Sequence, residues 1–463
     1  MHNNSSISMN ATLESSLAIA AEEEAAVRAV RDKNVTYLEH SPIQVDEKVY
    51  KRFDSHMTAF NVTSRKLGRP WPGFATEKGL EIILQGKTSC TVDLGSVAKS
   101  RALRALQAGT DALNMSLAAY GHGKENTGIL SWKPVHVPAP LRRENRPPDE
   151  TDPDTLTRQV KIMARLAGAD LVGVGPLNQR WFYSRIQRNY NAPEPPFHTK
   201  DIVFRDVPDP AETEEELIIP ESVTRVVVMA ISLNRVIMQT SPTTAANSMA
   251  ELGYSRMAMA VFSLAEFIRA QGYIAIPSMN GTGPSVPMAI EAGLGESGRH
   301  GLLITPEFGS VQRLCKVYTN MPLRLDKPID FGAVKFCETC KKCATKCPAK
   351  CLPTEDKRQW EPRVESNNGG VLKWYNDTMK CLQFWINNGN SCSVCIATCP
   401  FTKGASRVHK VTRFAIKHMP FVNPFWPYLD DALGFGARRD PGTVWDMEIG
   451  TYGLDPDMIP RSQ

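Results

Sequence analysis

Nine of the eleven cysteines lie in one stretch of the 463-residue chain, from Cys337 to Cys399. They include two sets spaced C-x2-C-x2-C-x3-C-P and C-x10-C-x2-C-x3-C-P. In the bacterial ferredoxin pattern the fourth cysteine of a run binds the other cluster, and thiolates at this spacing suit iron–sulfur clusters. The spacing therefore predicts two [4Fe–4S] clusters, one bound by Cys337, Cys340, Cys343 and Cys399 and the other by Cys347, Cys381, Cys392 and Cys395.

Zinc sites and disulfides are the competing interpretations of these cysteines. Two four-cysteine zinc sites would more often show separated C-x2-C pairs. Clustering of cysteines in one part of a large chain is not typical of a disulfide scaffold. Cys90, Cys315 and Cys351 are left over; we interpret Cys351 as a bystander beside a cluster and Cys90 as a small core residue. The cysteine region thus predicts electron transfer.

Charge and hydropathy disfavour several classes of function. The formal net charge is +5 and no block of five or six Lys or Arg occurs, so we expect no nucleic-acid partner. No apolar run approaches the roughly 18 residues of a membrane span. Residues 13–31 lack the basic region of an export signal, so we expect either a cytoplasmic chain or a mature exported one.

Motifs for the common redox cofactors are absent. The chain has no P-loop, and NGTGPS at 280–285 lacks the third glycine of a dinucleotide-binding turn. Flavin and nicotinamide are therefore not indicated by any motif. These motifs therefore do not identify the group that the predicted clusters would reduce.

The elements that must position such a group alternate between helical and strand patterns from about residue 156 to 320. We expect strands at 224–233 and 273–281 and helices at 253–272 and 286–301. This alternation predicts an α/β (or α+β) core. The units we expect are 1–145, a core at 146–330 with an insertion at about 178–222, a ferredoxin-like unit at 331–404, and a C-terminal unit at 405–463.

In addition to the cysteine spacing, several stretches of the sequence resemble the corrinoid-dependent reductive dehalogenases, most closely the tetrachloroethene-reducing type. They include YSRMAMAVF (254–262), GYIAIPSMNGTGPSV (272–286), EAGLGESGRHGLLITPEFG (291–309), DKPIDFG (326–332) and CPFTKG (399–404). The resemblance implies a nitroreductase-like core that binds a base-off corrinoid of the cobalamin type, with an appended bacterial ferredoxin-like domain holding two [4Fe–4S] clusters. The N-terminal unit would cover the corrinoid and the substrate pocket. The implied reaction is two-electron reductive removal of halogen from an organohalide.

The resemblance also implies the proton-donating residues. The family's donor is a tyrosine in a YSRM context, here Tyr254, with Arg313 to stabilise its tyrosinate and Asn280 beside them. A phenol needs such a cation because its ordinary pKa is near 10. Without the family, Tyr254 would be read as an ordinary core residue, and Arg299 with His300 would be an equal choice for the cation.

The substrate pocket and the corrinoid contacts follow from the same resemblance. Phe60, Trp71 and Trp385 match aromatic pocket walls, whereas Thr110 replaces a tryptophan and Ala250 a threonine. Chlorinated ethenes such as tetrachloroethene or trichloroethene are the expected substrates, and a larger haloalkane or haloaromatic is the alternative. The expected corrinoid contacts are Met257, Ser278, Asn280, Gly281, Ser285, Arg299, His300 and Pro306.

Two other functions compete with this one. An epoxyqueuosine reductase-like enzyme acting on tRNA would need a basic RNA surface and a helical repeat domain, and neither is seen. A ferredoxin-like electron carrier subunit would leave the roughly 320 residues before the cysteines without a task. For partners, the resemblance implies a small integral-membrane anchor protein at the outer face of the cytoplasmic membrane, and a homodimer is plausible.

Overall fold

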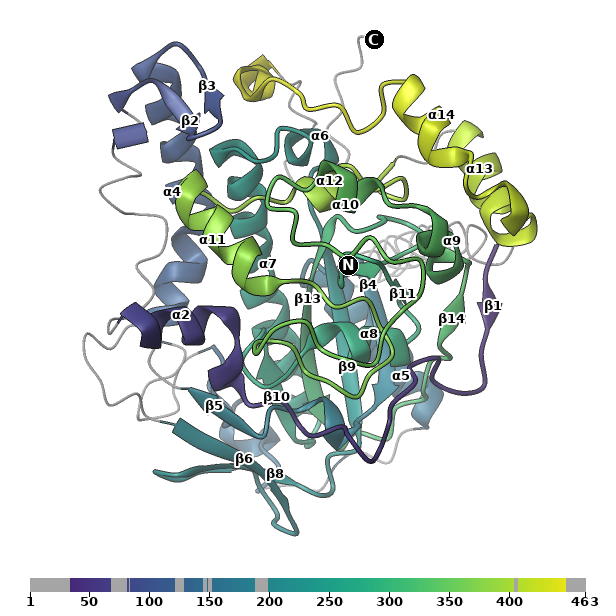
Figure 1. Ribbon diagram of the computed structural model, residues 1–463. Coiled ribbons are helices and arrows are strands. Elements are labelled where there is room, and N and C mark those ends of the chain that lie inside the picture. The colour runs from purple at the N-terminus through teal and green to yellow at the C-terminus, as the bar shows by residue number, and fades with distance from the viewer. Residues whose placement is uncertain are drawn as a thin grey trace, which may run out of the picture.

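The computed structural model describes residues 34–446 apart from 68–80, 83, 121–128, 145–147, 149–151, 188–198 and 404–406. At its centre is a four-stranded antiparallel sheet in the order β10-β13-β9-β4 (Figure 1). Its strands are β4 (Leu171–Pro176), β9 (Arg225–Ser232), β10 (Ala275–Ser278) and β13 (Gln312–Thr319). The strands expected around 224–233 and 273–281 are thus present.

Strand β9 explains why the sheet is buried on both faces. Its sequence RVVVMAIS is rich in β-branched residues, and every residue after Arg225 is buried. Successive side chains enter different hydrophobic clusters: Val226 and Val228 pack on one side, and Val227 and Met229 on the other. The sheet therefore separates two apolar layers.

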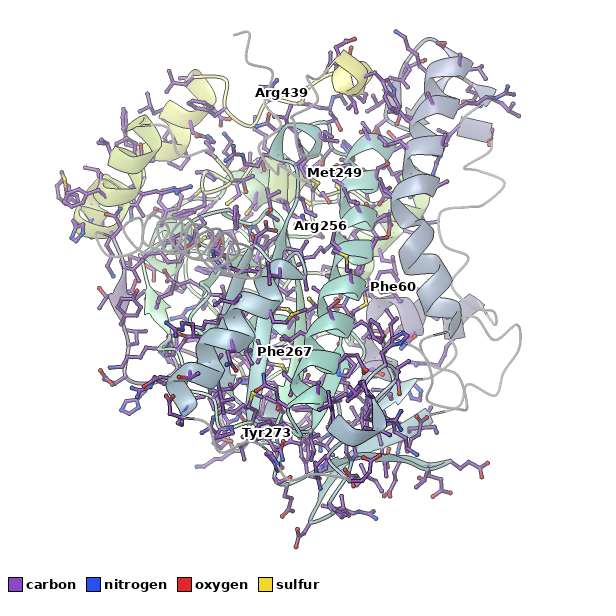
Figure 2. All side chains as sticks on the ribbon, turned by 180° about the vertical axis from the view of Figure 1, so that it is seen from behind. Phe60, Met249, Arg256, Phe267, Tyr273 and Arg439 are labelled. Atoms are coloured by element: carbon purple, nitrogen blue, oxygen red, sulfur yellow. The ribbon has the colours of Figure 1, made fainter. Side chains whose placement is uncertain are left out.

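Helices cover one of these layers. α5 (Pro153–Leu166) and α7 (Thr244–Ala270) bury Val160, Val261 and Leu264 against it, and α4 (Val97–Tyr120) packs along α7. Figure 2 follows α7 from Met249 through Arg256 to Phe267, with Tyr273 just beyond its end. α7 begins nine residues before the helix expected at 253–272.

The other layer is covered by α8 (Ser285–Glu291) and a second sheet. This sheet has the order β5-β6-β8-β7, and its strands pair within residues 185–220 (Figure 1). The strands are β5 (Arg185–Gln187), β6 (Thr199–Arg205), β7 (Ala211–Glu212) and β8 (Glu216–Pro220). The helix expected at 286–301 was too long: it ends at Glu291, and Gly293, with a φ of +73°, turns the chain away.

Short elements complete the described chain. The strands are β1 (Thr36–Tyr37), β2 (Lys87–Ser89), β3 (Val92–Asp93), β11 (Glu296–Ser297), β12 (Leu303–Ile304) and β14 (Ile329–Asp330). The helices are α2 (Ala59–Leu67), α6 (Arg235–Met238), α9 (Ala333–Thr339), α10 (Lys342–Lys346), α11 (Thr378–Asn388), α12 (Val394–Ala397), α13 (Arg407–His418) and α14 (Trp426–Ala432). No helix in these described ranges is both long and apolar enough to cross a bilayer.

Buried charges fasten the cysteine-bearing segment to the core. The carboxylate of Glu296 accepts backbone N–H bonds from Phe331, Ala333 and Val334, where α9 begins. The guanidinium of Arg299 is fully buried and donates to the carbonyls of residues 337, 338, 340, 353 and 355. These bonds fix the loops that carry Cys337 and Cys340.

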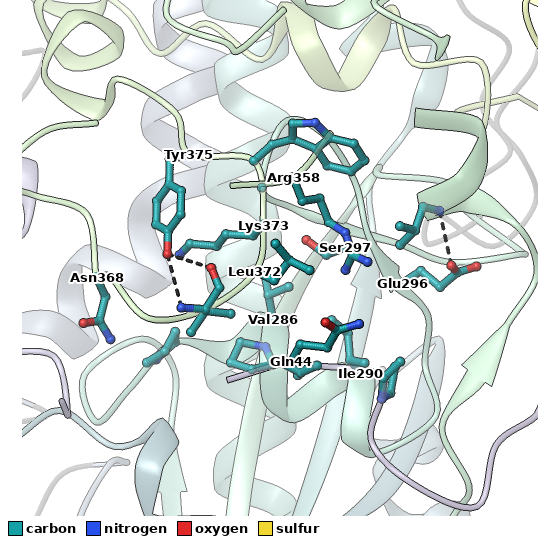
Figure 3. A pocket seen from close by; sticks show the side chains of 18 of the residues that line it. Gln44, Val286, Ile290, Glu296, Ser297, Arg358, Asn368, Leu372, Lys373 and Tyr375 are labelled. Carbon is teal, nitrogen blue, oxygen red and sulfur yellow. Dashed lines mark hydrogen bonds between the residues drawn. The ribbon is translucent and has the colours of Figure 1, made fainter. Parts of the chain in front are cut away.

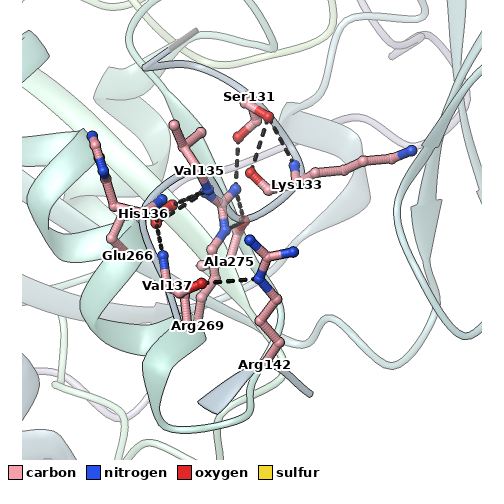
Figure 4. Close-up of polar contacts among 9 residues, drawn as sticks. All are labelled: Ser131, Lys133, Val135, His136, Val137, Arg142, Glu266, Arg269 and Ala275. Carbon is pink, nitrogen blue, oxygen red and sulfur yellow. Dashed lines mark hydrogen bonds and ion pairs between the residues drawn. The ribbon is translucent and has the colours of Figure 1, made fainter. Parts of the chain in front are cut away.

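A buried ion pair between Glu266 and Arg269 holds residues 131–137 against α7 (Figure 4). The carboxylate of Glu266 accepts N–H bonds from Val135, His136 and Val137 and pairs with Arg269 at 2.6 Å. Burial alone would raise the pKa of Glu266, but the N–H of His136 and the cation of Arg269 outweigh it, and the pKa is lowered from 4.5. The ionised form of Glu266 therefore stabilises the folded state.

We predict that Glu266→Gln lowers the free energy of unfolding at pH 7 by about 1–3 kcal/mol, because three N–H donors lose a charged acceptor. A lowered folded pKa means that this contribution is complete above about pH 4.5 and is lost as the pH falls through the folded pKa. Urea unfolding at several pH values would measure it, with the exposed Glu214→Gln as control. A gap between Glu266→Gln and wild type that widens on acidification would contradict this account.

Candidate active site and cysteine sets

Three elements bring Tyr254, Arg313 and Asn280 together. Tyr254 lies on α7, Arg313 on β13, and Asn280 in the turn after β10. The side-chain amide of Asn280 donates to the phenol oxygen of Tyr254 at 3.1 Å. The guanidinium carbon of Arg313 lies 4.4 Å from the centroid of the Tyr254 ring. The three residues implied by the resemblance therefore form one constellation.

This geometry suits proton donation by the phenol. Because the Tyr254 oxygen accepts the bond from Asn280, its own O–H is free to point at a bound molecule. A cation over the ring stabilises the negative charge that develops when the proton leaves. The buried Nε of Arg313 has no hydrogen-bond partner among the residues the structure describes.

A glycine allows the close approach of α7 to β13. A Cβ at Gly253 would lie 2.7 Å from the Leu233 side chain and 2.8 Å from the Cγ of Arg313. Any larger residue would push Arg313 away from the next residue on the helix, Tyr254. The glycine in the GYSRM stretch is thus required by packing.

Lys316 positions the turn that carries Asn280, and the sequence reasoning missed it. Its side chain is fully buried, and its ammonium donates to the carbonyls of Met279 and Gly283 and to the Ser285 hydroxyl. Burial lowers the pKa of Lys316 to about 7. A lysine within the apolar strand sequence RLCKVYT was the signal that could have revealed it.

Four helices, α2, α4, α7 and α11, carry the expected pocket residues that the structure describes. The rings of Phe60, on α2, and Trp385, on α11, are 6.1 Å apart. Ala250 is buried one turn before Tyr254 on α7, and the carbonyl of Thr110 accepts from the Ser255 hydroxyl. Trp385 also follows Cys381 by one turn of α11. Trp71 lies outside the described residues.

The expected corrinoid contacts divide into two groups. Asn280 and Gly281 are exposed at the turn, and a Cβ at Gly281 would meet nothing within 4 Å. The hydroxyls of Ser278 and Ser285 bond within the turn, to Thr282 and Lys316. Pro306 is buried in the tight turn closed by the Thr305–Gly309 bridge.

Met257, Arg299 and His300 are also expected contacts, and their side chains are buried in the protein. Met257 is buried in the core behind Tyr254. Arg299 uses its donors on the carbonyls of the cysteine loops, so it is also excluded as the cation for Tyr254. His300 accepts from the Leu302 N–H and contacts the Ser310 hydroxyl through its other nitrogen, and burial lowers its pKa to about 4. The sequence could not show the partners of Arg299, because they lie 38 to 56 residues further along the chain.

The cysteines form two neighbouring groups. Cys399 lies with Cys337 and Cys340 in one apolar cluster, and these three thiols, close to Cys343, raise the pKa of Cys343 after the larger effect of burial. Cys347 packs with the remaining members of the second set, Cys381, Cys392 and Cys395. In the described ranges, no group of three or more His, Cys, Asp or Glu side chains is arranged to hold a single metal ion.

The three leftover cysteines differ in position, and Cys90 is exposed rather than a core residue as expected. The Sγ of Cys351 lies 3.4 Å from the Sγ of Cys347, and it also contacts Cys381. Cys351 is therefore part of the second group rather than a mere neighbour of it. Cys315 is fully buried on β13 in the core.

A cavity of about 750 Å³ opens beside α8, with Val286 and Ile290 in its wall (Figure 3). It lies between α8, residues 42–53 and residues 358–378. Aromatic side chains are prominent in its wall, among them Tyr50, Phe53, Trp181, Tyr183, Trp374 and Tyr375. Pro284 and Val286 connect this wall to the turn.

Comparisons with known proteins identify the family and the fold. The model of the reductive dehalogenase subunit family matches residues 182–323. A solved reductive dehalogenase, described as B12-dependent, superposes with a TM-score of 0.58 over 87% of this chain. At 20% identity that likeness shows the mixed α/β fold alone, and the match covers 49% of that structure, so the chain spans about half its length.

Two curated relatives are more similar in sequence. The tetrachloroethene reductive dehalogenase of Desulfitobacterium hafniense is 34% identical over 359 residues, which cover 72% of this chain and 64% of that protein. The tetrachloroethene reductive dehalogenase of Sulfurospirillum multivorans is 44% identical over 433 residues, which cover 90% of this chain and 86% of that protein. On this extent of identity, the chain belongs to the reductive dehalogenase family.

Proposed function

We propose that this chain removes halogen reductively from a small organohalide. One carbon–halogen bond breaks, two electrons and one proton enter, and a carbon–hydrogen bond and a halide ion result. The observation that carries the proposal is the joint placement of Tyr254, Asn280 and Arg313 in a chain that also gathers two groups of cysteines.

The cavity fits the base-off corrinoid that such chemistry requires. Its volume of about 750 Å³ and its aromatic wall suit a large, flat, partly apolar ligand. The turn residues Asn280 and Gly281, with Ser285 beside them, would lie against the ligand, as the nitroreductase-like core of this family implies. A bound corrinoid would supply cobalt as the reductant of the carbon–halogen bond.

The residues of this chain would supply the proton and exclude water. Tyr254 donates from its phenol oxygen, Arg313 stabilises the tyrosinate, and Asn280 orients the ring oxygen. Lys316 keeps Asn280 in place through the three bonds to its turn. Phe60 and Trp385 would form the apolar wall against which a halocarbon packs.

We infer that the two cysteine groups hold [4Fe–4S] clusters in a bacterial ferredoxin-like domain and deliver the electrons. The first would take Cys337, Cys340, Cys343 and Cys399, and the second Cys347, Cys381, Cys392 and Cys395. Cys347 as a ligand carries no proton, so the thiol of Cys351 would donate to it across the 3.4 Å contact. Hydrogen bonds to cluster sulfurs tune reduction potentials.

Chlorinated ethenes such as tetrachloroethene and trichloroethene are the proposed substrates. Both relatives compared above carry tetrachloroethene in their names. Thr110 and Ala250 are smaller than the tryptophan and threonine expected at these positions, so a larger haloalkane or haloaromatic is the second candidate. An electron carrier would have no use for the Tyr254 constellation. An epoxyqueuosine reductase-like function would leave the similarity to dehalogenases over 90% of the chain unexplained.

We propose that the chain binds a small integral-membrane anchor protein and is located at the outer face of the cytoplasmic membrane. This follows from the family resemblance. The exposed aromatic residues Phe421, Phe425 and Tyr428 of the C-terminal unit are candidates for that contact or for a homodimer interface.

We predict that Tyr254→Phe lowers turnover of tetrachloroethene by about 10²–10⁴-fold, because the ring stays but the proton donor is lost. Cobalt and iron contents should remain those of the wild type. Steady-state halide release by anaerobically purified protein would measure the effect, with the exposed Tyr428→Phe as control. Unchanged turnover in Tyr254→Phe would remove the proton-donor assignment.

We predict that Cys395→Ser and Cys351→Ser differ in iron content. Loss of a ligand in the second set should reduce iron from about eight to about four per chain, whereas Cys351→Ser should keep about eight. Iron analysis with electron paramagnetic resonance of the reduced protein would compare them. Equal loss of iron in both variants would show that Cys351 is itself a ligand.

A further inference from the structure

Two buried lysines flank the first group of cysteines, which comprises Cys337, Cys340, Cys343 and Cys399. Lys342 lies between Cys340 and Cys343 in the chain, and Lys403 follows Cys399 by one helical turn's length of sequence. Their side chains are only 1% and 5% exposed. Burial raises the pKa of both Cys399 and Cys340, and the ammonium of Lys403 opposes this rise at Cys399, as that of Lys342 does at Cys340. Both cations therefore act on thiols of this group.

A short segment of the C-terminal unit holds the two lysines together. The carboxylate of Asp430, on α14, forms ion pairs with both ammonium groups. Lys342 also pairs with Asp431 at 3.0 Å and donates to the carbonyl of Phe435 at 2.7 Å. The ammonium of Lys403 lies 4.3 Å from the centroid of the Phe435 ring. The positions of both cations are thus fixed by residues 430–435.

A glycine allows this segment to lie directly against the first cysteine group. Gly436 has a φ of +76°, and a Cβ there would lie 3.2 Å from the Cα of Thr398 and 3.3 Å from the Nζ of Lys342. Thr398 is the residue before Cys399. Because the lysine side chains are enclosed in this way, water screens their charges much less than it screens charges at the surface.

The second group of cysteines has a different charge environment. The lysines that adjoin its members in the sequence, Lys346, Lys350 and Lys380, are exposed. Solvent and salt screen the charge of an exposed lysine. The strong positive field is therefore a feature of the first group.

We propose that the Lys403 ammonium, held in place by Asp430, raises the reduction potential of the cluster bound by the first cysteine group. This inference rests on the proposed function, which supplies the clusters. A cluster that accepts an electron gains one negative charge, so a nearby buried cation stabilises its reduced form. Net charge and solvent exposure are among the factors that set the potentials of iron–sulfur clusters. Lys403 thereby favours residence of the electron on the first cluster.

The test is a redox titration of the full chain, with both clusters assembled without oxygen, followed by electron paramagnetic resonance. We expect Lys403→Met to lower the equilibrium constant for reduction of one cluster about tenfold, which is about 59 mV for a one-electron couple. The potential of the other cluster should stay at its wild-type value. Burial lowers the pKa of Lys403 to about 7, so the titration is run at about pH 6, where the ammonium form predominates.

Three further variants separate charge from packing. Lys403→Arg should keep the wild-type potential within about threefold in the equilibrium constant, because arginine retains the charge. Asp430→Asn should move the same potential upward, because less negative charge then offsets the two ammonium groups. Lys66→Met removes an exposed lysine on α2 that pairs with Glu365, and it should change neither potential.

The identity of the shifted cluster is part of the test. It should be the cluster that remains in Cys395→Ser, the variant expected to lack the second one. Unchanged potentials in Lys403→Met, equal shifts of both clusters, or a downward shift in Asp430→Asn would overturn the inference. Loss of iron from both Lys403 variants would also overturn it, because the residue would then serve cluster assembly instead. Wild-type protein that holds no iron after anaerobic reconstitution would refute the proposed clusters themselves, so the two failures can be told apart.

Discussion

The position of the Arg313 guanidinium over the Tyr254 ring is the contact on which the rest of the site depends. It requires α7 and β13 to approach closely, which only a glycine at 253 permits. It also requires β13 to be central and antiparallel, between β9 and β10, so that Arg313 and the Asn280 turn lie at the same end of the sheet. Core packing and proton chemistry are thus fixed by the same geometry.

Buried charges are the second theme of this structure. Lys316, Arg299 and Glu296 are nearly or fully buried, and each is bonded largely or wholly to backbone atoms of a turn or loop. A buried charge is tolerated only when such bonds are made, so each of these residues specifies one loop conformation. Together they tie the Asn280 turn and the cysteine loops to a rigid sheet.

Elements fixed by interactions that are local in sequence were predicted better than contacts between segments that are distant in sequence. Strand β9 and helix α7 were recognisable because their apolar patterns are long and local. The helix expected at 286–301 was wrong after Glu291, because Gly293 and the pairing of β11 with β12 end it. Arg299 and His300 looked like site residues beside GLLITPEF, yet their bonds go to residues 337–355 and to Ser310. Nothing in the local sequence records the partners of Arg299, which lie far along the chain.

The sequence by itself determined the spacing of the cysteines, the alternation of helices and strands, and the family. The resemblance also named Tyr254, Arg313 and Asn280, although composition alone would have left Tyr254 in the core. Only the tertiary structure decided that Lys316 supports the Asn280 turn and that Cys351 touches Cys347. These features depend on contacts between segments far apart in the chain, and such contacts arise from packing rather than from local pattern.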